Sequence, residues 1–273
     1  MARIYLDYNA STPIDPAVAA AMRPFIDGAF GNPSSGHWAS APAKAALEEA
    51  RGKVAAMLGA AADEVVFTSG GSEANNLALK GTFFALAHVG DHIVTTTVEH
   101  PSILAPCGFL ERLGGKVSYL PVDATGRVDP DVVRRAITAR TILISVMHAN
   151  NEVGTIQPIE EIGAIAREHC VRFHTDAAQS VGKISTDVDA LGVDLLTVAG
   201  HKLYAPKGVG ALYVRRGTAL EPLIHGAGHE HGLRAGTESA LLAVGLGAAS
   251  ELALRRGFNP DVPPHLNKVT ETV

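Results

Sequence analysis

Cysteine, aromatic side chains, long apolar runs and blocks of like charge are all scarce in this 273-residue chain. Its two cysteines, Cys107 and Cys170, are too few for a disulfide framework, so a reducing cytoplasm is the compartment we expect. No apolar run reaches the roughly eighteen residues that a transmembrane helix needs, which argues against a membrane protein. The formal net charge is -5 and no long basic run occurs, so we expect no nucleic acid partner.

The chain does contain a regular alternation of short apolar runs and helical patterns. Hydrophobic residues make up 47 % of it and charged residues 19 %, which is typical of a globular enzyme with a substantial core. Apolar strands separated by helices favour an α/β fold, in which helices cover both faces of a mostly parallel sheet in three αβα layers. The expected strands are Glu64–Thr68, His92–Thr97, Lys116–Pro121, Thr141–Met147, Val171–Thr175, Asp194–Ala199 and Gly210–Val214. The expected helices include Glu73–Ala87, Ser102–Leu113, Pro130–Ala139 and Ile159–His169.

The periodic pattern weakens after about Arg256. The last residues include Pro260, Pro263 and Pro264 and show no clear period. We therefore expect one domain over residues 1–256 and an irregular tail over residues 257–273.

Two charged residues follow predicted strands, at the edge where ligands bind in parallel sheets. Lys202 comes just after the strand that ends at Ala199, and burial there would lower the pKa of its amine and favour attack on an aldehyde. A lone lysine in a loop is more often simply solvated. Asp176 could pair with a pyridinium nitrogen, although an aspartate in this setting is commonly a helix N-cap. Gln179 lies three residues further on and could point the same way.

Three further segments at strand ends carry weaker signals. The turn at Gly71 and Ser72 precedes a helix, whose N-terminal N–H groups could bind phosphate, although such turns often need glycine anyway. His100 could stack on a flat ring or relay a proton, or it could be a structural histidine. Asn151 could bond a phenolic oxygen, or it could be a turn residue. The five signals together are stronger than each alone, because all lie at strand ends of one sheet.

Taken together, the motifs resemble the class V aminotransferase-fold enzymes, and specifically the cysteine desulfurases, which use pyridoxal 5'-phosphate. The resemblance extends from Arg3 to about Arg256. It implies the large domain of a fold type I pyridoxal-phosphate enzyme, with the small domain largely missing. Residues 1–256 would then form the cofactor-binding domain, and their N-terminal part would contribute to the small domain or a dimer contact. The motifs that carry it are Tyr5-Leu-Asp-Tyr-Asn-Ala-Ser-Thr-Pro, Gly31-Asn-Pro-Ser-Ser, Thr97-Val-Glu-His100, His148-Ala-Asn-Asn-Glu-Val-Gly, Asp176-Ala-Ala-Gln179-Ser, Gly200-His-Lys202 and Gly228-His-Glu-His-Gly-Leu-Arg-Ala-Gly-Thr237.

The resemblance implies a role for each residue near the cofactor ring. Lys202 would hold pyridoxal phosphate as a Schiff base and afterwards move protons. Asp176 would pair with the pyridine nitrogen. Gln179 and Asn151 would contact the side of the phenolic oxygen. His100 would stack over the ring and assist proton transfer.

The resemblance also implies a phosphate site that two subunits share. Gly71, Ser72 and His201 would hold the phosphate, and Thr237 would reach the phosphate of a partner subunit, so a homodimer is expected. The family often has a serine three residues before the cofactor lysine, where this chain has Ala199. Loss of that hydroxyl contact would cost about 1–3 kcal/mol if nothing replaces it.

Two further features depart from the family pattern. His225, His229 and His231 could suggest a metal, but the family has a glycine-histidine loop there, so we expect none. The nucleophilic cysteine of the desulfurases lies past the end of this chain, which we therefore expect to be C-terminally truncated. Cys107 and Cys170 are interpreted as buried small apolar residues rather than as that nucleophile.

The leading functional hypothesis from the sequence is a cysteine desulfurase. It would convert L-cysteine to L-alanine and pass the sulfur to an acceptor or scaffold protein for iron–sulfur cluster or thio-cofactor assembly. One alternative is a selenocysteine lyase or cysteine lyase of the same fold. Another is a catalytically impaired remnant that binds the cofactor without turnover.

Overall fold

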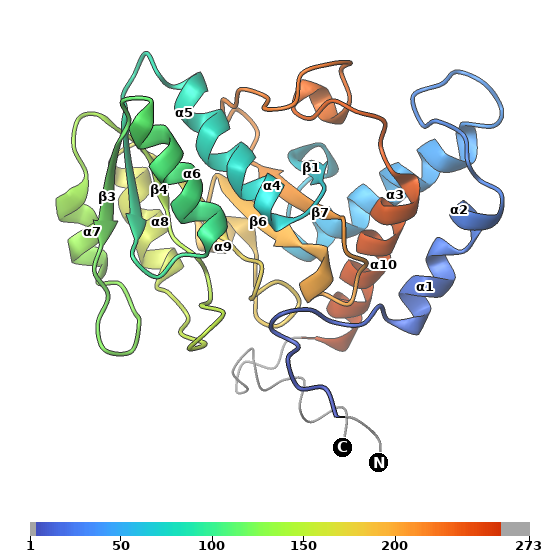
Figure 1. Ribbon diagram of the computed structural model, residues 1–273, viewed down its shortest axis with the longest axis horizontal. Coiled ribbons are helices and arrows are strands. Elements are labelled where there is room, and N and C mark those ends of the chain that lie inside the picture. Colours follow the sequence, from blue (N-terminus) through green and yellow to red (C-terminus); the bar gives the residue numbers. More distant parts are fainter. Residues whose placement is uncertain (1–3, 258–273) are drawn as a thin grey trace.

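A seven-stranded sheet organises residues 4–257, the part of the chain that the computed structural model describes (Figure 1). The strand order is β1-β7-β6-β5-β4-β2-β3. The strands are β1 Val65–Thr68, β2 His92–Thr96, β3 Lys116–Leu120, β4 Thr141–Ser145, β5 Arg172–Asp176, β6 Leu195–Ala199 and β7 Gly210–Val214. All seven predicted strands are confirmed to within two residues at each end.

The sheet is parallel except at one strand. β2 to β6 pair in parallel with their neighbours, whereas β7 runs antiparallel to both β6 and β1. A parallel return needs a crossover of a dozen or more residues, usually a helix, and segment 200–209 between β6 and β7 is too short for one. The expectation of a mostly parallel sheet is therefore confirmed, and the one reversal follows from a short connection.

Helices cover both faces of the sheet, which confirms the three-layer αβα architecture (Figure 1). On one face lie α4 Gly71–Asn76, a π-helical turn Leu77–Gly81, α5 Thr82–Ala85 and α6 Pro101–Arg112. The opposite face carries α3 Ala41–Leu58, α7 Pro130–Ala136, α8 Ile159–Glu168 and α9 Val188–Leu191. Beyond α3 lie α10 Ala240–Arg256, α1 Pro16–Met22 and α2 Pro24–Asp27. Three 3-10 turns complete the elements, at Ala62–Glu64, Gly200–Lys202 and Glu230–Gly232.

Two apolar cores separate the sheet from its helical layers. Alternate strand residues feed them: Val65 and Phe67 belong to the core that includes α3, α8 and α10, whereas Val66 belongs to the core that includes α4, α5 and α6. This alternation is expected because successive side chains of a strand point to opposite faces. The apolar runs that predicted the strands are thus explained by burial on both faces.

The long helices α3 and α10 were not predicted, and their packing explains why. A Cβ on Gly247 would lie 2.8 Å from the Cβ of Ala50, so the two helices approach too closely for larger side chains. Small residues spread around a helix leave no strong apolar stripe, and the stripe is the main sequence signal of a helix.

A buried ion pair ties the loop before α10 to the sheet. Arg51 of α3 donates from two nitrogens to the carboxylate of Glu230, at 2.7 and 2.9 Å, and also to the Val65 carbonyl at 2.7 Å. Glu230 in turn accepts from the backbone N–H of Phe67 at 2.7 Å. Glu230 and His231 have φ values of 47° and 59°, a left-handed conformation that non-glycine residues rarely adopt. The ion pair holds that strained backbone in place.

The part of the chain that is described contains no helix long and apolar enough to cross a membrane. The tail predicted over residues 257–273 lies outside the described residues, except for Gly257 at its start.

Replacing Arg51 by alanine should lower the free energy of unfolding by about 3–5 kcal/mol, because the buried Glu230 carboxylate would lose its partner. Urea denaturation followed by circular dichroism measures this change. Arg255→Ala is the matched control: Arg255 pairs with Glu251 but its side chain is 70 % exposed, so the loss should stay below about 1 kcal/mol. Equal losses in the two variants would contradict the structural importance of the buried pair.

Candidate active site

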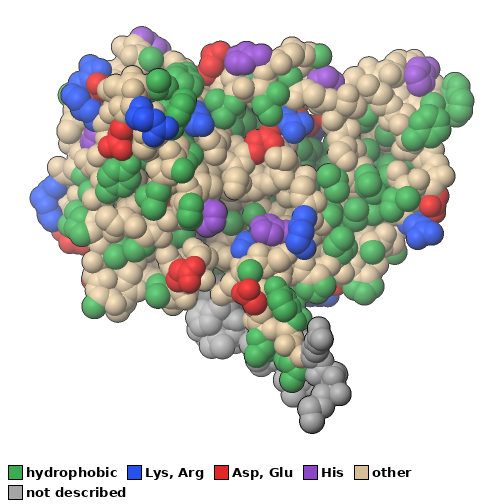
Figure 2. Space-filling model, in the orientation of Figure 1, with side chains coloured by type: hydrophobic (Ala, Val, Ile, Leu, Met, Phe, Trp, Pro, Cys, Tyr) green, Lys and Arg blue, Asp and Glu red, His purple; other side chains and the backbone are tan. Residues whose placement is uncertain are grey.

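A cavity of about 870 Å³ opens at the carboxyl ends of the parallel strands. Histidine and basic side chains lie next to one another near the centre of the face shown in Figure 2. Of the nine residues expected at the site, eight line this cavity: Gly71, Ser72, His100, Asn151, Asp176, Gln179, His201 and Lys202. Residues from distant parts of the sequence therefore meet where the strand pattern predicted.

Lys202 reaches the cavity through the tight turn that follows β6. Gly200 begins that turn, and a Cβ there would lie 2.8 Å from the Val209 carbonyl, so the close approach requires glycine. The Lys202 amine donates a hydrogen bond to the Asn9 carbonyl. Partial burial lowers the pKa of this amine, against the opposing effect of the nearby Asp176 carboxylate. A lowered pKa increases the fraction of neutral, nucleophilic amine.

Asp176 is the last residue of β5, and its carboxyl group is buried. One oxygen accepts from Nδ2 of Asn75 at 2.7 Å, and the other accepts from the backbone N–H of Ala178 at 3.0 Å. Burial raises the pKa of the carboxyl, whereas these hydrogen bonds and the nearby His100 and Lys202 lower it. No helix begins at Asp176, so the N-cap interpretation does not apply here.

A chain of side-chain hydrogen bonds connects His100 to Asp176. Nδ1 of His100 accepts from the backbone N–H of Ser102 at 3.1 Å, so the neutral ring carries its proton on Nε2. Ser102 Oγ lies 2.7 Å from the same Nδ1 and accepts from Asn75 Nδ2 at 2.8 Å. Asn75 and Ser102 were not predicted. Their only sequence signal is that each lies in the first turns of a helix that follows a predicted site residue.

One buried atom in this network lacks a partner. Asn75 Oδ1 has no hydrogen bond within residues 4–257, although Asn75 lines the cavity. It lies on the residue that also bonds the Asp176 carboxylate, so two acceptors gather at one end of the cavity. Buried acceptors are normally paired, and this pair suits a ligand that presents an N–H group carrying positive charge.

Glycine shapes the turn that leads into α4. Gly70 has φ +151°, and a Cβ on Gly71 would lie 3.1 Å from the Cβ of Ala199, a tight contact that favours glycine where α4 begins close to the end of β6. Ser72 and His201 line the cavity beside this turn. Backbone N–H groups at the start of a helix are well suited to phosphate.

Asn9, which was not predicted as a site residue, joins three of the expected ones. Its carbonyl accepts from Gln179 Nε2 at 3.0 Å and also from the Lys202 amine. Its own Nδ2 donates to the carbonyl of Asn151 at 3.5 Å. Its sequence signal was the motif that begins at Tyr5, which carried the resemblance without assigning a role to any residue.

Thr237 is the one expected residue that does not line the cavity, and its side chain is exposed. Its expected contact with a partner subunit therefore stays a prediction.

Among residues 4–257 no group of three possible metal ligands occurs. In the histidine-rich loop, Nε2 of His229 lies 3.8 Å from Oε2 of Glu238, and Nε2 of His225 lies 3.9 Å from Oε1 of Glu221.

Neither cysteine lies at the cavity. Cys107 is buried in α6, and burial raises the pKa of its thiol to about 12, so it is an inert apolar side chain. Cys170 is exposed, which contradicts the prediction of a buried residue. It precedes β5, so the length of that strand, roughly 15 Å, separates it from Asp176. A positive φ of 54° at Cys170 explains the exposure, because the residue forms the turn that ends α8.

Glu99 is a fully buried carboxyl group that joins two segments of the site. Its oxygens accept from Thr96 Oγ1 at 2.8 Å and from the Met147 N–H at 3.0 and 3.1 Å. These bonds tie the end of β2, which carries His100, to the segment after β4, which carries Asn151. Burial raises the pKa of Glu99 to about 8.

The raised pKa predicts a pH-dependent stability that Glu99→Gln should remove. The folded protein holds the Glu99 proton more tightly than the unfolded chain does, so this stabilisation is complete below pH 4.5 and is lost as pH rises to about 8. The unfolding free energy of the parent should therefore fall, relative to Glu99→Gln, between about pH 5 and about pH 8 in urea denaturation. Parallel pH profiles for the two proteins would show that Glu99 is ionised throughout.

Residues 4–263 match the family described as aminotransferase class-V. A protein named "Cysteine desulfurase IscS" from Dictyoglomus turgidum is 55 % identical over 251 residues, which cover 92 % of this chain and 64 % of that relative. This chain therefore spans less than two thirds of the length of that curated relative.

Solved structures show the same likeness. One named "SspA in complex with cysteine" superposes with a TM-score of 0.89 and 48 % identity, covering 91 % of this chain and 72 % of that chain. One named "NIFS-LIKE PROTEIN" gives a TM-score of 0.91 and 39 % identity, covering 93 % and 70 % of the two chains. The large-domain fold of a fold type I pyridoxal-phosphate enzyme is thus shown. The chain belongs to the aminotransferase class-V family.

Proposed function

We propose that this protein is a pyridoxal-phosphate-dependent cysteine desulfurase that converts L-cysteine to L-alanine. The observation that carries the proposal is the cavity in which the Lys202 amine and the buried Asp176 carboxyl face the same space from neighbouring strands. The similarity to proteins named cysteine desulfurase, and to a structure named as a complex with cysteine, supports this substrate.

The residues of the cavity fit pyridoxal phosphate from end to end. Asp176 would pair with the ring nitrogen, next to the unpartnered Asn75 Oδ1. The turn at Gly71 and Ser72, with His201, would hold the phosphate. When bound, the cofactor supplies an electron sink for bond breaking on the amino acid.

The protein's own groups would then bind, orient and move protons. Burial lowers the pKa of the Lys202 amine and so increases its neutral fraction, which would hold the cofactor aldehyde and would serve as a base toward the bound substrate. His100 carries its proton on Nε2, so it can donate that proton in the cavity while Ser102 fixes its ring. Gln179 and Asn151 would contact the phenolic oxygen side.

We also propose that Thr237 completes the phosphate site of a second subunit in a homodimer. Its side chain is exposed and lies away from the cavity of its own chain. Arg234, three residues earlier, pairs with Glu73 at 2.9 Å, and Glu73 also accepts from the Ser69 N–H at the phosphate turn. The loop that carries Thr237 is therefore fixed to the turn expected to bind phosphate.

The sulfur must leave on an acceptor thiol. The balanced reaction is L-cysteine plus a thiol, giving L-alanine plus a persulfide. The C–S bond breaks and an S–S bond forms. One thiol hydrogen ends on the methyl group of alanine, and the other stays on the persulfide. Cys107 and Cys170 lie away from the cavity. The acceptor in our proposal is therefore a thiol other than these two, finally on a protein of iron–sulfur cluster or thio-cofactor assembly.

Lys202→Ala should abolish the visible absorption band of bound pyridoxal phosphate and lower L-alanine formation by at least about 100-fold, because the covalent link and the base are lost together. Absorbance spectra with borohydride treatment, together with amino acid analysis, measure both effects. Lys44→Ala, at an exposed lysine of α3, serves as the control and should behave as the parent. A borohydride-sensitive band that survives in Lys202→Ala would refute the assignment.

L-Alanine formation should depend on added thiol and should rise at least about tenfold with a small-molecule thiol in excess, because neither cysteine of this chain reaches the cavity. Cys170→Ser should leave that rate unchanged. Loss of activity in Cys170→Ser would show that this cysteine does accept sulfur.

The same absence of a cysteine at the cavity favours a second candidate, a selenocysteine or cysteine lyase. A lyase would break the C–Se or C–S bond without any thiol acceptor and release elemental selenium or sulfur together with L-alanine, and a selenocysteine lyase would prefer L-selenocysteine. The thiol dependence of product release therefore separates the two activities. A cofactor-binding remnant would show the absorption band but no product from either amino acid.

A further inference from the structure

We propose that Lys183 is a positioning residue that fixes the side-chain amide of Gln179, so that the amide presents an N–H group to the cofactor cavity. The role in catalysis rests on the proposed function. The orientation of the amide does not depend on it and is tested separately.

A series of hydrogen bonds connects Lys183 to the cavity. Lys183 is 4 % exposed, and its amine donates to Gln179 Oε1 at 3.0 Å. Gln179 Nε2 then donates to the Asn9 carbonyl at 3.0 Å, and the same carbonyl accepts from the Lys202 amine. A buried lysine is thus connected to the cofactor lysine through one amide and one carbonyl.

Lys183 determines which atoms of Gln179 donate and which accept in this series of hydrogen bonds. A lysine ammonium group can only donate hydrogen bonds, so the atom of Gln179 that faces Lys183 must be the oxygen. The nitrogen must then face Asn9, whose carbonyl can only accept. Without Lys183 the amide could turn over and place its oxygen against that carbonyl or toward the ring of the cofactor.

One N–H of Gln179 is left for a ligand. An amide nitrogen carries two N–H groups, and the described residues provide one acceptor for them, the Asn9 carbonyl. Gln179 lines the cavity, and its expected contact is the phenolic oxygen of the cofactor. A donor at that point stabilises the negative charge of the oxygen, whereas a turned amide would repel it.

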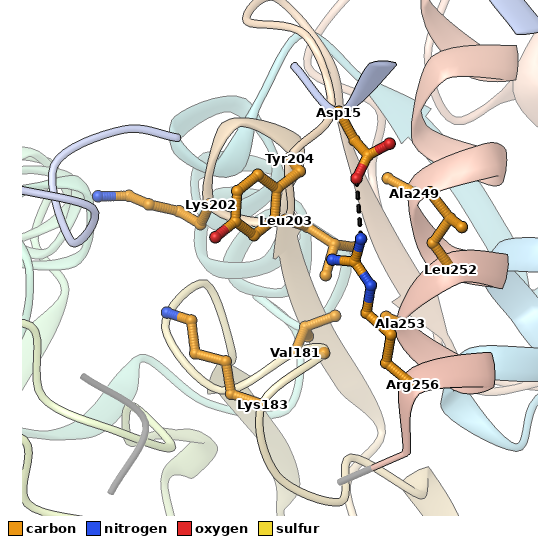
Figure 3. A pocket seen from close by; sticks show the side chains of 11 residues that line it. Asp15, Val181, Lys183, Lys202, Leu203, Tyr204, Ala249, Leu252, Ala253 and Arg256 are labelled. Atoms are coloured by element: carbon orange, nitrogen blue, oxygen red, sulfur yellow. Dashed lines mark hydrogen bonds and ion pairs between the residues drawn. The ribbon is translucent and has the colours of Figure 1, made fainter. Parts of the chain in front are cut away.

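Packing holds Lys183 in position. Gly182 has φ +74°, and a Cβ there would lie 2.2 Å from Cδ1 of Leu203, so this turn packs directly against the residue after Lys202. Figure 3 shows Lys183 and Lys202 extending from these two neighbouring segments toward the same side of a smaller pocket. The packing of Gly182 against the Leu203 side chain thus adds to the hydrogen bonds that connect the two lysines.

The first test uses a favourable feature of the composition: the chain has only two glutamines, Gln157 and Gln179. Nuclear magnetic resonance of protein labelled with ¹⁵N-glutamine therefore resolves two side-chain amides. In Lys183→Met, which keeps the apolar stem and removes the ammonium group, hydrogen exchange of the Gln179 amide should accelerate at least about fivefold. Gln157 is an internal control, because its amide bonds Gly126 and Val128 elsewhere and should not change.

Further variants keep the test decisive. Lys183→Arg retains a hydrogen-bond donor, adds no glutamine and should keep most of the slow exchange, and Lys183→Leu, which also lacks a donor, is the second test variant if Lys183→Met fails to fold. Lys116→Met removes an exposed lysine at the start of β3 and should leave both amides unchanged. Unchanged exchange at Gln179 in Lys183→Met, or equal acceleration at Gln157, would overturn the proposal.

The second test measures the absorption of the bound cofactor. With pyridoxal phosphate bound, loss of a hydrogen-bond donor makes the phenolic oxygen more basic, so the proton next to that oxygen is released only at a higher pH. The pH at which the visible band titrates should therefore rise by about half to one unit in Lys183→Met. In a Gln179→Ala background the same substitution should add no shift, because the two residues act through one amide.

The outcomes separate the two proposals. Shifts that add fully in the double variant would overturn the positioning role, even though cofactor binding stood. A parent protein that binds no pyridoxal phosphate would contradict the proposed function, and the amide exchange would still decide the role of Lys183.

Discussion

A buried carboxyl group and a partly buried amine, held at the ends of two adjacent parallel strands, are the constraint on which the rest of the site depends. Pairing of β5 with β6 sets Asp176 beside Thr197, two residues before the end of β6. Lys202 follows in the next turn, close enough for the carboxylate to oppose the pKa loss that burial causes. Asn75 bonds the Asp176 carboxylate, and the Asn9 carbonyl bonds the Lys202 amine, so both groups are held by neighbours that line the same cavity.

The sequence predicted the strands and their polar ends well, and the structure shows why. Apolar runs such as β4 and β6 are buried on both faces, so hydrophobicity alone marks them, and the first polar residue after each run falls at the ligand edge. Asn75 and Asn9 could not be found in this way. Asn75 meets Asp176 across 101 residues of sequence and Asn9 meets Gln179 across 170, and no local pattern encodes a contact between such separate elements.

Buried polar groups around the cavity form connected networks instead of isolated contacts. Glu99 accepts three hydrogen bonds, and Lys183 donates to an amide that is itself bonded onward. Burial of such groups is unfavourable unless each is satisfied, and a satisfied network restricts the side chains to one arrangement. This rigidity is what a cofactor site needs, because the ring must meet a donor at one edge and an acceptor at the other.

The two buried acids, Glu99 and Asp176, are also coupled through charge. Burial is the main cause of the raised pKa of Glu99, and the nearby Asp176 carboxylate adds to it. A cationic ring nitrogen beside Asp176 would favour its ionised form, and an ionised Asp176 in turn favours a protonated Glu99. A protonated Glu99 would let Asp176 keep its charge without a second buried anion nearby. The segment that holds both Glu99 and His100 would thus also influence the charge state of the Asp176 carboxylate.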